Sequence, residues 1–267
     1  MSISLGTFIM IKDKGKVSAL YRFLHPRVLT IHPDYKSLEP FILSLPMRFR
    51  RNEGVVIHRG RNELRRMEYG GVTYVVKSFH QPNWLNRVIY GVFRASKAKR
   101  SFLYADAFLK LGVGTPQPVG SMDQRQGLLF DKSYYVSCLS DCPYVYSDLF
   151  VQKFECEEKV LREIGRVTAI LHENGYAHKD YGRGNILFRP MPDGSVKIEI
   201  VDLNRMYIGH IGLRRGCRNF ERLPATPEMH RLMAEEYAKV RGFDAEKCFQ
   251  LISYYRRLQT EKGGELY

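Results

Sequence analysis

The sequence predicts an α+β fold of two lobes, with a small antiparallel sheet in the N-terminal lobe and mainly helices in the C-terminal lobe. Short apolar strands separated by Gly-containing turns dominate residues 54–79. Apolar residues at helical spacing dominate the chain after residue 155, apart from one hairpin. We therefore predict an N-terminal lobe at residues 1–140 and a C-terminal lobe at residues 141–267, with the chain crossing between them near Leu139–Asp148.

The first 80 residues predict strands. Phe8–Ile11 and Val28–Ile31 are candidates for short strands. Four prolines argue against a long helix before residue 50: Pro26, Pro33, Pro40 and Pro46. From Gly54 onward the turns become regular, and three strands at residues 55–58, 63–69 and 72–79 predict an antiparallel meander.

Two helices and three further strands are expected next. A helix begins near Asn83, with apolar residues at helical spacing from Trp84 to Phe93. A second helix runs from about Ser96 to Leu111 and ends at Gly112. The strands are expected near residues 119–122, 127–130 and 133–139.

The C-terminal lobe is expected to be built from three long helices. Ser147 is a candidate N-cap, and an amphipathic helix is predicted over Glu155–Asn174. A basic loop containing Arg214, Arg215 and Arg218 precedes predicted helices near residues 227–241 and 245–257.

The stretch Tyr176–Arg205 carries the chemistry. Two β-arms flank a Pro/Gly turn; Asp180 and Asn185 precede the first arm and Asp202 ends the second. Phosphoryl transfer needs one carboxylate to orient the attacking hydroxyl, and an amide and a second carboxylate to hold Mg²⁺. The H-x-D-x-x-x-x-N spacing and the final aspartate therefore favour a phosphoryl-transfer site over a surface hairpin with polar ends.

Positive charge is concentrated in the first part of the chain. Of the net charge of +14, +13 lies within residues 1–110, which hold 20 Lys and Arg against 7 Asp and Glu. This asymmetry indicates an anionic partner, such as a membrane surface, a phosphorylated substrate or nucleic acid. A nucleic-acid partner is not expected, because basic residues alternate with aromatic ones only within Trp84–Phe93.

The cysteines and the N-terminal residues indicate the compartment. The five cysteines are scattered without a C-x-x-C pair, so we expect neither a disulfide framework nor a zinc site. The opening residues MSISLGTFIMIKDKGK do not have the pattern of a signal peptide, and no apolar run is long enough to span a bilayer. We therefore expect a cytoplasmic protein, peripheral to the inner face of the cytoplasmic membrane or free of it.

The motifs resemble those of protein-kinase-like folds: VVK ending at Lys77, HKDYGRGN at 178–185 and VDLNR around Asp202. Longer segments resemble the Kdo/WaaP lipopolysaccharide kinase family, from about Gly54 to Phe243. They are RGRNE, KSFHQPNWLNRVIYGVFRASKAKRSF, LGVGTPQP, the HKDYGRGN loop, and DLNRM in place of D-F-G.

This resemblance implies a role for each motif residue, with ATP and Mg²⁺ as cofactors. Asp180 would be the catalytic residue that accepts the hydroxyl proton, while Asn185 and Asp202 would bind Mg²⁺. The implied nucleotide-binding residues are Lys77, Gly60 and Leu139. His178 would brace the loop, and Arg183 would either help to neutralise phosphate or be an exposed loop residue.

Three features depart from the kinase pattern. The loop expected to cover the phosphates carries only Gly60 instead of a glycine series. Ser101 stands where relatives usually carry the glutamate that pairs with the lysine, and Asp106 is the only acidic residue on that predicted helix. No A-P-E segment follows Asp202, so we expect no switching by activation-loop phosphorylation.

The leading hypothesis is an ATP-dependent kinase that phosphorylates a sugar hydroxyl of the lipopolysaccharide inner core, on Kdo or a heptose. Lipopolysaccharide core or another anionic acceptor is then the expected partner. Two alternatives stay open: a kinase for a small molecule or protein tyrosine, and a pseudokinase or basic adaptor. The complete set of Asp180, Asn185 and Asp202 argues against the adaptor, and Ser101 argues for it.

Overall fold

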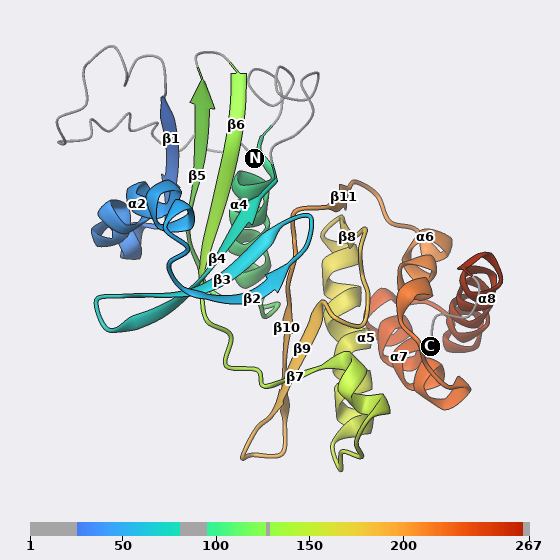
Figure 1. Cartoon of the computed structure of the whole chain (residues 1–267). Coiled ribbons are helices and arrows are strands. Elements are labelled where there is room, and N and C mark those ends of the chain that lie inside the picture. The colour runs from blue at the N-terminus through green and yellow to red at the C-terminus, as the bar shows by residue number, and fades with distance from the viewer. Residues whose placement is uncertain (1–25, 81–94, 127–128, 264–267) are drawn as a thin grey trace, which may run out of the picture. The chain divides into compact units, whose positions relative to one another are not determined.

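The computed structural model describes residues 26–80, 95–126 and 129–263 (Figure 1). The chain divides into two units. The first comprises Met1–Tyr104 and Gln117–Leu139, and the second comprises Ala105–Pro116 and Ser140–Tyr267. Two predicted elements, the strand at Phe8–Ile11 and the helix from Asn83 to Phe93, lie outside the described residues.

The first unit is built on a six-stranded antiparallel sheet in the order β1-β5-β6-β4-β3-β2. Its strands are β1 (Arg27–Ile31), β2 (Val55–Arg59), β3 (Glu63–Tyr69), β4 (Val72–Phe79), β5 (Pro118–Gln126) and β6 (Leu129–Cys138). The meander predicted over residues 55–79 is confirmed as β2, β3 and β4, and the strand expected at Val28–Ile31 is β1.

The three strands expected between residues 119 and 139 are instead two long ones, β5 and β6. The polar residues after Met122 continue β5, because their backbone pairs on both sides. Asp123 lies opposite Val28 of β1 and opposite Ser133 of β6. Backbone pairing needs no apolar side chain, so an apolar pattern understates the length of this strand.

A helix covers one face of this sheet, although the prolines argued against a long one. After the 3₁₀ turn η1 (Pro33–Leu38), α2 spans Glu39–Arg50. Pro40 stands in its first turn, where no N–H bond is lost, and Pro46 is accommodated inside the helix. Phe41, Ile42 and Leu45 are fully buried against the sheet. Burying side chains of this size stabilises the unit by roughly 1.5–3 kcal/mol each.

The predicted second helix is α4 (Lys97–Lys110). Gly112 follows it with φ +72°, a conformation that glycine adopts without strain. Residues 105–116, from within α4 onward, belong to the second unit, although we predicted a lobe that included all of residues 1–140. Gly114 in this segment lies close to β10: Ile200 N–H donates to Gly114 O at 2.9 Å, and a Cβ on Gly114 would lie 2.0 Å from Ile198 O.

Helices make up most of the second unit, as predicted. They are η2 (Tyr146–Phe150), α5 (Glu157–Glu173), α6 (Leu213–Arg218), η3 (Asn219–Arg222), α7 (Pro227–Arg241) and α8 (Ala245–Gly263). Gly165 allows α5 to pack closely on α7, since a Cβ there would lie 2.4 Å from Met233 O. No helix within the described ranges is both long and apolar enough to cross a bilayer.

Two local predictions in this unit are wrong. Ser147 lies inside η2, and Asp148 instead caps this turn by accepting a bond from Val145 N–H at 2.9 Å. The expected basic loop is the helix α6, which buries Gly216 and Cys217 and leaves its arginines outside. Its burial pattern depends on contacts with α8 and η3 that the local sequence does not reveal.

Two small sheets position the loop that contains Asp180 and Asn185. β10 (Val196–Ile200), β9 (Ile186–Pro190) and β7 (Tyr144–Val145) form one, and β11 (Met206–Ile208) pairs with β8 (Tyr176–His178) in the other. The predicted hairpin is thus confirmed as β9 and β10, with Ile200 paired to Ile186. The loop between β8 and β9 contains Asp180 and Asn185, and Asp202 follows β10.

Candidate active site

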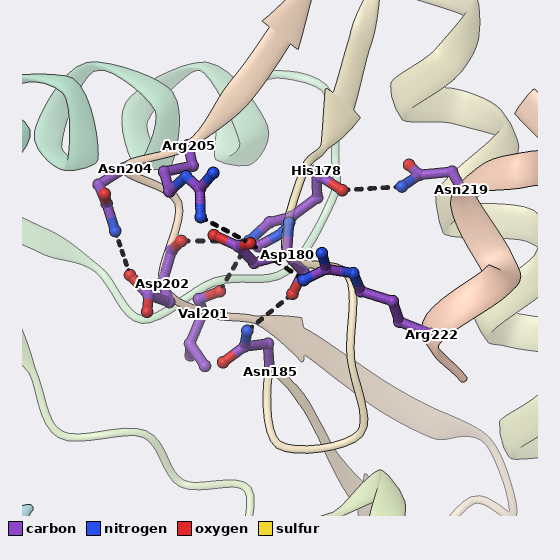
Figure 2. A network of polar contacts seen from close by, with 9 residues as sticks. All are labelled: His178, Asp180, Asn185, Val201, Asp202, Asn204, Arg205, Asn219 and Arg222. Atoms are coloured by element: carbon purple, nitrogen blue, oxygen red, sulfur yellow. Dashed lines mark hydrogen bonds and ion pairs between the residues drawn. The ribbon is translucent and has the colours of Figure 1, made fainter. Parts of the chain in front are cut away.

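The loop between β8 and β9 is held in a tight turn by Asn185. Its side-chain Nδ2 donates to Asp180 O at 2.8 Å, and its backbone N–H donates to Gly182 O at 2.9 Å (Figure 2). Val201 N–H donates to Asn185 O at 3.0 Å. Asn185 therefore joins the loop to the end of β10, just before Asp202.

His178 connects the two predicted acidic residues through their backbones. It is buried, and its Nδ1 accepts the Asp180 N–H at 3.1 Å. The other nitrogen, Nε2, then carries the proton and donates to Val201 O and Asp202 O, both at 3.2 Å. Burial lowers the pKa of His178, although the nearby Asp202 opposes the shift. The resemblance implied that His178 braces the loop, and its ring contacts with both backbone segments agree with that role.

Asp202 has an unusual backbone conformation, with φ +60°. Residues other than glycine rarely adopt this backbone conformation, and among them aspartate and asparagine tolerate it best. Asn204 donates through Nδ2 to Asp202 Oδ1 in a short contact. Such strained positions cluster at functional sites when the surroundings hold them in place.

Two arginines bind the predicted catalytic carboxylate, and we did not predict either contact. Arg205 NH1 lies 3.0 Å from Asp180 Oδ1, and Arg222 NH1 lies 3.2 Å from the same oxygen (Figure 2). Arg205 stands within the DLNRM motif, so the sequence held a signal for it. Arg222 lies 42 residues from Asp180 and belongs to no motif that we identified.

Beneath the loop, a buried polar contact fixes Tyr181. Thr168 on α5 donates its hydroxyl to Ile164 O at 2.6 Å, so Tyr181 donates its own hydroxyl to Thr168 Oγ1 at 2.7 Å. Tyr181 is 2% exposed, and its ring also contacts Phe220 edge-on. The residue after Asp180 is thereby anchored in the core of the second unit.

The predicted nucleotide-binding residues all lie in the first unit. Lys77 is on β4 between Leu64 of β3 and Tyr135 of β6, and its Nζ lies 5.4 Å from the Phe79 ring centre. It alternates with the buried Val76, so it lies on the sheet face opposite the α2 core. Hydrogen bonds join Asp180, Asn185 and Asp202 in one network in the second unit. Lys77 lies in the first unit.

Gly60 and Leu139 are both exposed. Gly60 lies in the turn between β2 and β3, where its N–H donates to Asn62 O at 3.1 Å. A Cβ there would lie 2.9 Å from the His58 ring. Leu139 directly follows β6 and is the last residue of the first unit.

Ser101, at the position of the missing glutamate, and Asp106, its possible replacement, both make hydrogen bonds within their own helix. Ser101 is buried and donates its hydroxyl to Lys97 O at 3.0 Å, within its own helix. Asp106 Oδ2 accepts a bond from Lys110 Nζ at 2.7 Å, one turn further along α4.

A second acidic cluster, which we did not predict, includes Glu199 of β10, three residues before Asp202. Ligand atoms of Asp141, Cys142 and Glu199 lie within 4.8 Å of one another. Lys197 already binds both carboxylates, at 2.6 Å from Asp141 and 2.9 Å from Glu199. Burial raises the pKa of the Cys142 thiol to about 11, so the thiol stays protonated near neutral pH. The cluster is therefore an ion-pair network that supports the hairpin.

The donor set around the loop suits a hard cation. Asp202 offers a carboxylate, and Asn185 offers an amide oxygen, since its nitrogen is used in the loop. Oxygen donors of this type are the ligands that Mg²⁺ takes in proteins. The residues present therefore fit the metal that phosphoryl transfer needs.

Comparison with known proteins agrees with this geometry. The model of the lipopolysaccharide kinase (Kdo/WaaP) family matches residues 58–255. No curated protein sequence gives a significant match. A solved structure described as WaaP in complex with acyl carrier protein is similar, with a TM-score of 0.62 and 16% identity over 89% of this chain and 99% of that one.

A second solved structure is more distant. The Rio2 kinase–ADP/Mg²⁺–phosphoaspartate complex from Chaetomium thermophilum gives a TM-score of 0.45 and 17% identity, covering 82% of this chain and 76% of the other. The WaaP likeness and the family match together show the protein-kinase-like fold that the motifs predicted.

Proposed function

The chain belongs to the lipopolysaccharide kinase (Kdo/WaaP) family and is therefore a phosphotransferase acting on a sugar hydroxyl, and from this premise we propose that it phosphorylates the lipopolysaccharide inner core on Kdo or a heptose, using ATP. The observation that carries the proposal is the network in which His178 and Asn185 hold Asp180 beside Asp202.

Asp180 would act on the acceptor. Its carboxylate would orient the hydroxyl and accept the proton while the hydroxyl oxygen bonds to the γ-phosphorus of ATP and the bond to the β-phosphate oxygen breaks. A weak base is sufficient, because the charge that leaves on ADP is stabilised separately. Asn185 and Asp202 would hold Mg²⁺, which would neutralise charge on the phosphates.

The nucleotide would be bound by residues of the first unit. We propose that Lys77 contacts the α- and β-phosphates as a point charge, with Gly60 and Leu139 completing the nucleotide site. Support comes from the place of Lys77 on a central strand, opposite the face that α2 covers.

The deciding experiment is ATP turnover by the purified protein with and without purified core lipopolysaccharide, followed by mass spectrometry of the acceptor. Turnover that depends on the core, with a gain of one phosphate, is expected. Turnover only with a protein or small-molecule acceptor would replace the proposed acceptor. Nucleotide binding without any transfer would indicate a pseudokinase or adaptor.

We also propose that the protein meets the membrane peripherally, through its basic first part. Most of the Trp84–Arg100 segment lies outside the described residues. Lys97, Lys99 and Arg100 at the start of α4 are only partly exposed, so charge reversal there would also disturb packing. Charge reversal is therefore made at two other basic residues of the segment, Arg87 and Arg94.

Vesicle co-sedimentation tests this contact. Binding is expected to require anionic lipid, to weaken with salt and to fall in the Arg87→Glu, Arg94→Glu variant. Equal binding to neutral and anionic vesicles would contradict it.

A further inference from the structure

We propose that Arg205 and Arg222 form the anion-binding subsite for the acceptor: they would bind a carboxylate or phosphate group that the acceptor carries next to the hydroxyl that reacts. The inference rests on the proposed function and adds to it the chemical feature by which the acceptor is selected. Both arginines are at present paired with Asp180 Oδ1, the carboxylate that would accept the proton (Figure 2).

The backbone of Arg205 is fixed to the loop. Lys179 N–H donates to Arg205 O at 3.0 Å, and the next residue, Met206, pairs with His178 across β11 and β8. The guanidinium end, in contrast, is exposed, with 60% of the side chain accessible. A side chain whose backbone is fixed and whose charged end is accessible can bind a ligand without reorganising the fold.

Arg222 is held in the same way from a different element. It ends η3, which is anchored by the fully buried Phe220 and Leu223 on either side of its last turn. Asn219, at the start of η3, donates to His178 O at 2.7 Å. Arg222 itself is 49% accessible.

The charges at this point do not balance. Two guanidinium groups share the one carboxylate of Asp180, so these three side chains together carry a net charge of +1. The same loop also presents Lys179 and Arg183, both exposed. A second anion would offset this excess, and guanidinium groups bind carboxylates and phosphates through paired N–H donors.

The pairing also bears on catalysis. Both arginines bind the same carboxylate oxygen, Oδ1, so an acceptor hydroxyl that approaches this oxygen has to displace at least one of them. Ion pairs that are this exposed contribute only about 0–1 kcal/mol each, so exchanging them for an acceptor anion costs little. Binding of the correct acceptor anion would thus release Oδ1 of Asp180 for the acceptor hydroxyl.

Steady-state kinetics with matched acceptors tests the subsite. The acceptors are a core oligosaccharide with its sugar-acid carboxylates and phosphates intact, the same oligosaccharide with the carboxylates methyl-esterified, and the same oligosaccharide treated with phosphatase. The enzymes are the wild type, Arg205→Gln, Arg222→Gln and a control, Arg231→Gln. The side chain of Arg231 is 49% accessible, like that of Arg222, and it binds Glu246 instead of Asp180.

We expect the wild type to prefer the intact acceptor over one of the two neutralised ones by roughly tenfold or more, because hydrogen bonds to a charged group are strong. Whichever treatment lowers kcat/KM identifies the anion as carboxylate or phosphate. Arg205→Gln and Arg222→Gln should raise KM for the intact acceptor and remove most of that preference. KM for ATP should not change, and Arg231→Gln should behave as the wild type.

Three results would overturn the inference, and they are distinguishable. Equal wild-type turnover of all three acceptors would leave the proposed function standing without an anion subsite. A rise in KM for ATP alone would place the arginines on the nucleotide phosphates. A loss of kcat that is equal for every acceptor would mean that they only position Asp180. No turnover of any core acceptor by the wild type would instead remove the proposed function itself, and this inference with it.

Discussion

Asn219 donates its side-chain N–H to His178 O at 2.7 Å, and thereby ties η3 to the strand that precedes the candidate active-site loop. Its amide oxygen meets Nε2 of His172 on α5 at 2.9 Å, and Nδ1 of His172 meets the Tyr237 hydroxyl of α7 at 2.9 Å. One asparagine thus links the loop to two of the long helices of the second unit.

This buried link predicts a loss of stability in acid. Burial lowers the pKa of His172 to about 4, with the Arg241 cation adding to the shift. His172 therefore binds a proton more readily in the unfolded chain than in the folded one. The contribution of the neutral His172 to the free energy of unfolding is fully present above pH 6.5 and is lost as the pH falls toward 4. For one buried histidine this contribution is roughly 3 kcal/mol.

Urea unfolding between pH 7.5 and 4 measures this effect. The His172→Gln variant should be less stable at pH 7.5 but should show a shallower fall below pH 6.5. The exposed His210→Gln variant is the control and should follow the wild type. A slope that is unchanged in His172→Gln would assign the acid sensitivity to another group, such as His230, whose pKa burial also lowers to about 4.

In the first unit the opposite dependence is expected from Asp123. Burial raises the pKa of this carboxyl to about 6, against the opposing effects of Ser96 and Arg125. The folded state therefore favours the protonated form, so the contribution of this carboxyl to stability is greatest below about pH 4 and declines as the pH rises through 6. Asp123→Asn should raise the free energy of unfolding at pH 8 by roughly 2 kcal/mol.

Thermal and urea unfolding at pH 5 and pH 8 check this, with Glu68→Gln on the exposed side of β3 as the control. The benefit of Asp123→Asn should be larger at pH 8. An equal benefit at both pH values would show that ionisation of Asp123 is not the cause.

Asp180→Asn is expected to lower phosphoryl transfer by roughly 10²–10⁴-fold, the usual contribution of a general base. Nucleotide affinity should be about unchanged. The fold should survive as well, because the two ion pairs that are lost are exposed and individually weak. Transfer and nucleotide binding are measured on the same preparation, and transfer near the wild-type rate would refute the assignment.

The strained backbone of Asp202 determines which substitution can test the metal site. Alanine would add a conformational penalty at φ +60°, whereas asparagine tolerates this region and removes only the charge. Asp202→Asn should therefore weaken Mg²⁺-dependent nucleotide binding while stability stays close to wild type. Coincident Mg²⁺ titrations of the two proteins would exclude Asp202 as a ligand.

Lys77 and Asp106 are expected to act independently in ATP binding. Asp106 is engaged by Lys110 on its own helix, so Lys77→Ala should weaken ATP binding by roughly tenfold or more and Asp106→Ala should add little. The double variant should match the sum of the single effects within about 0.5 kcal/mol. A clear deviation from additivity would establish Asp106 as the partner of Lys77.

The sequence predicted what short-range patterns encode. The meander before Phe79, the amphipathic helix α5 and the hairpin that ends before Asp202 follow from turn residues and periodicity within a few positions. What it could not predict depends on distant contacts. The helix α6 buries Gly216 and Cys217 through contacts with α8 and η3, and β5 runs through polar residues because two neighbouring strands pair with it.

The candidate site shows the same limit. Asp180, Asn185 and Asp202 were predictable because one hairpin brings them together. Arg222 reaches Asp180 only because Phe220 and Asn219 fix a turn from much later in the chain.

The close approach of Gly114 to β10 limits how this protein can be divided into fragments. The chain passes between the two units three times, after Tyr104, Pro116 and Leu139. A fragment that starts at Ser140 would keep Asp180, Asn185 and Asp202 but would lack residues 105–116, leaving the Ile200 N–H without its acceptor and uncovering one edge of the hairpin. Expression of the C-terminal part alone would therefore need the α4 end supplied as a separate peptide or joined through a new linker.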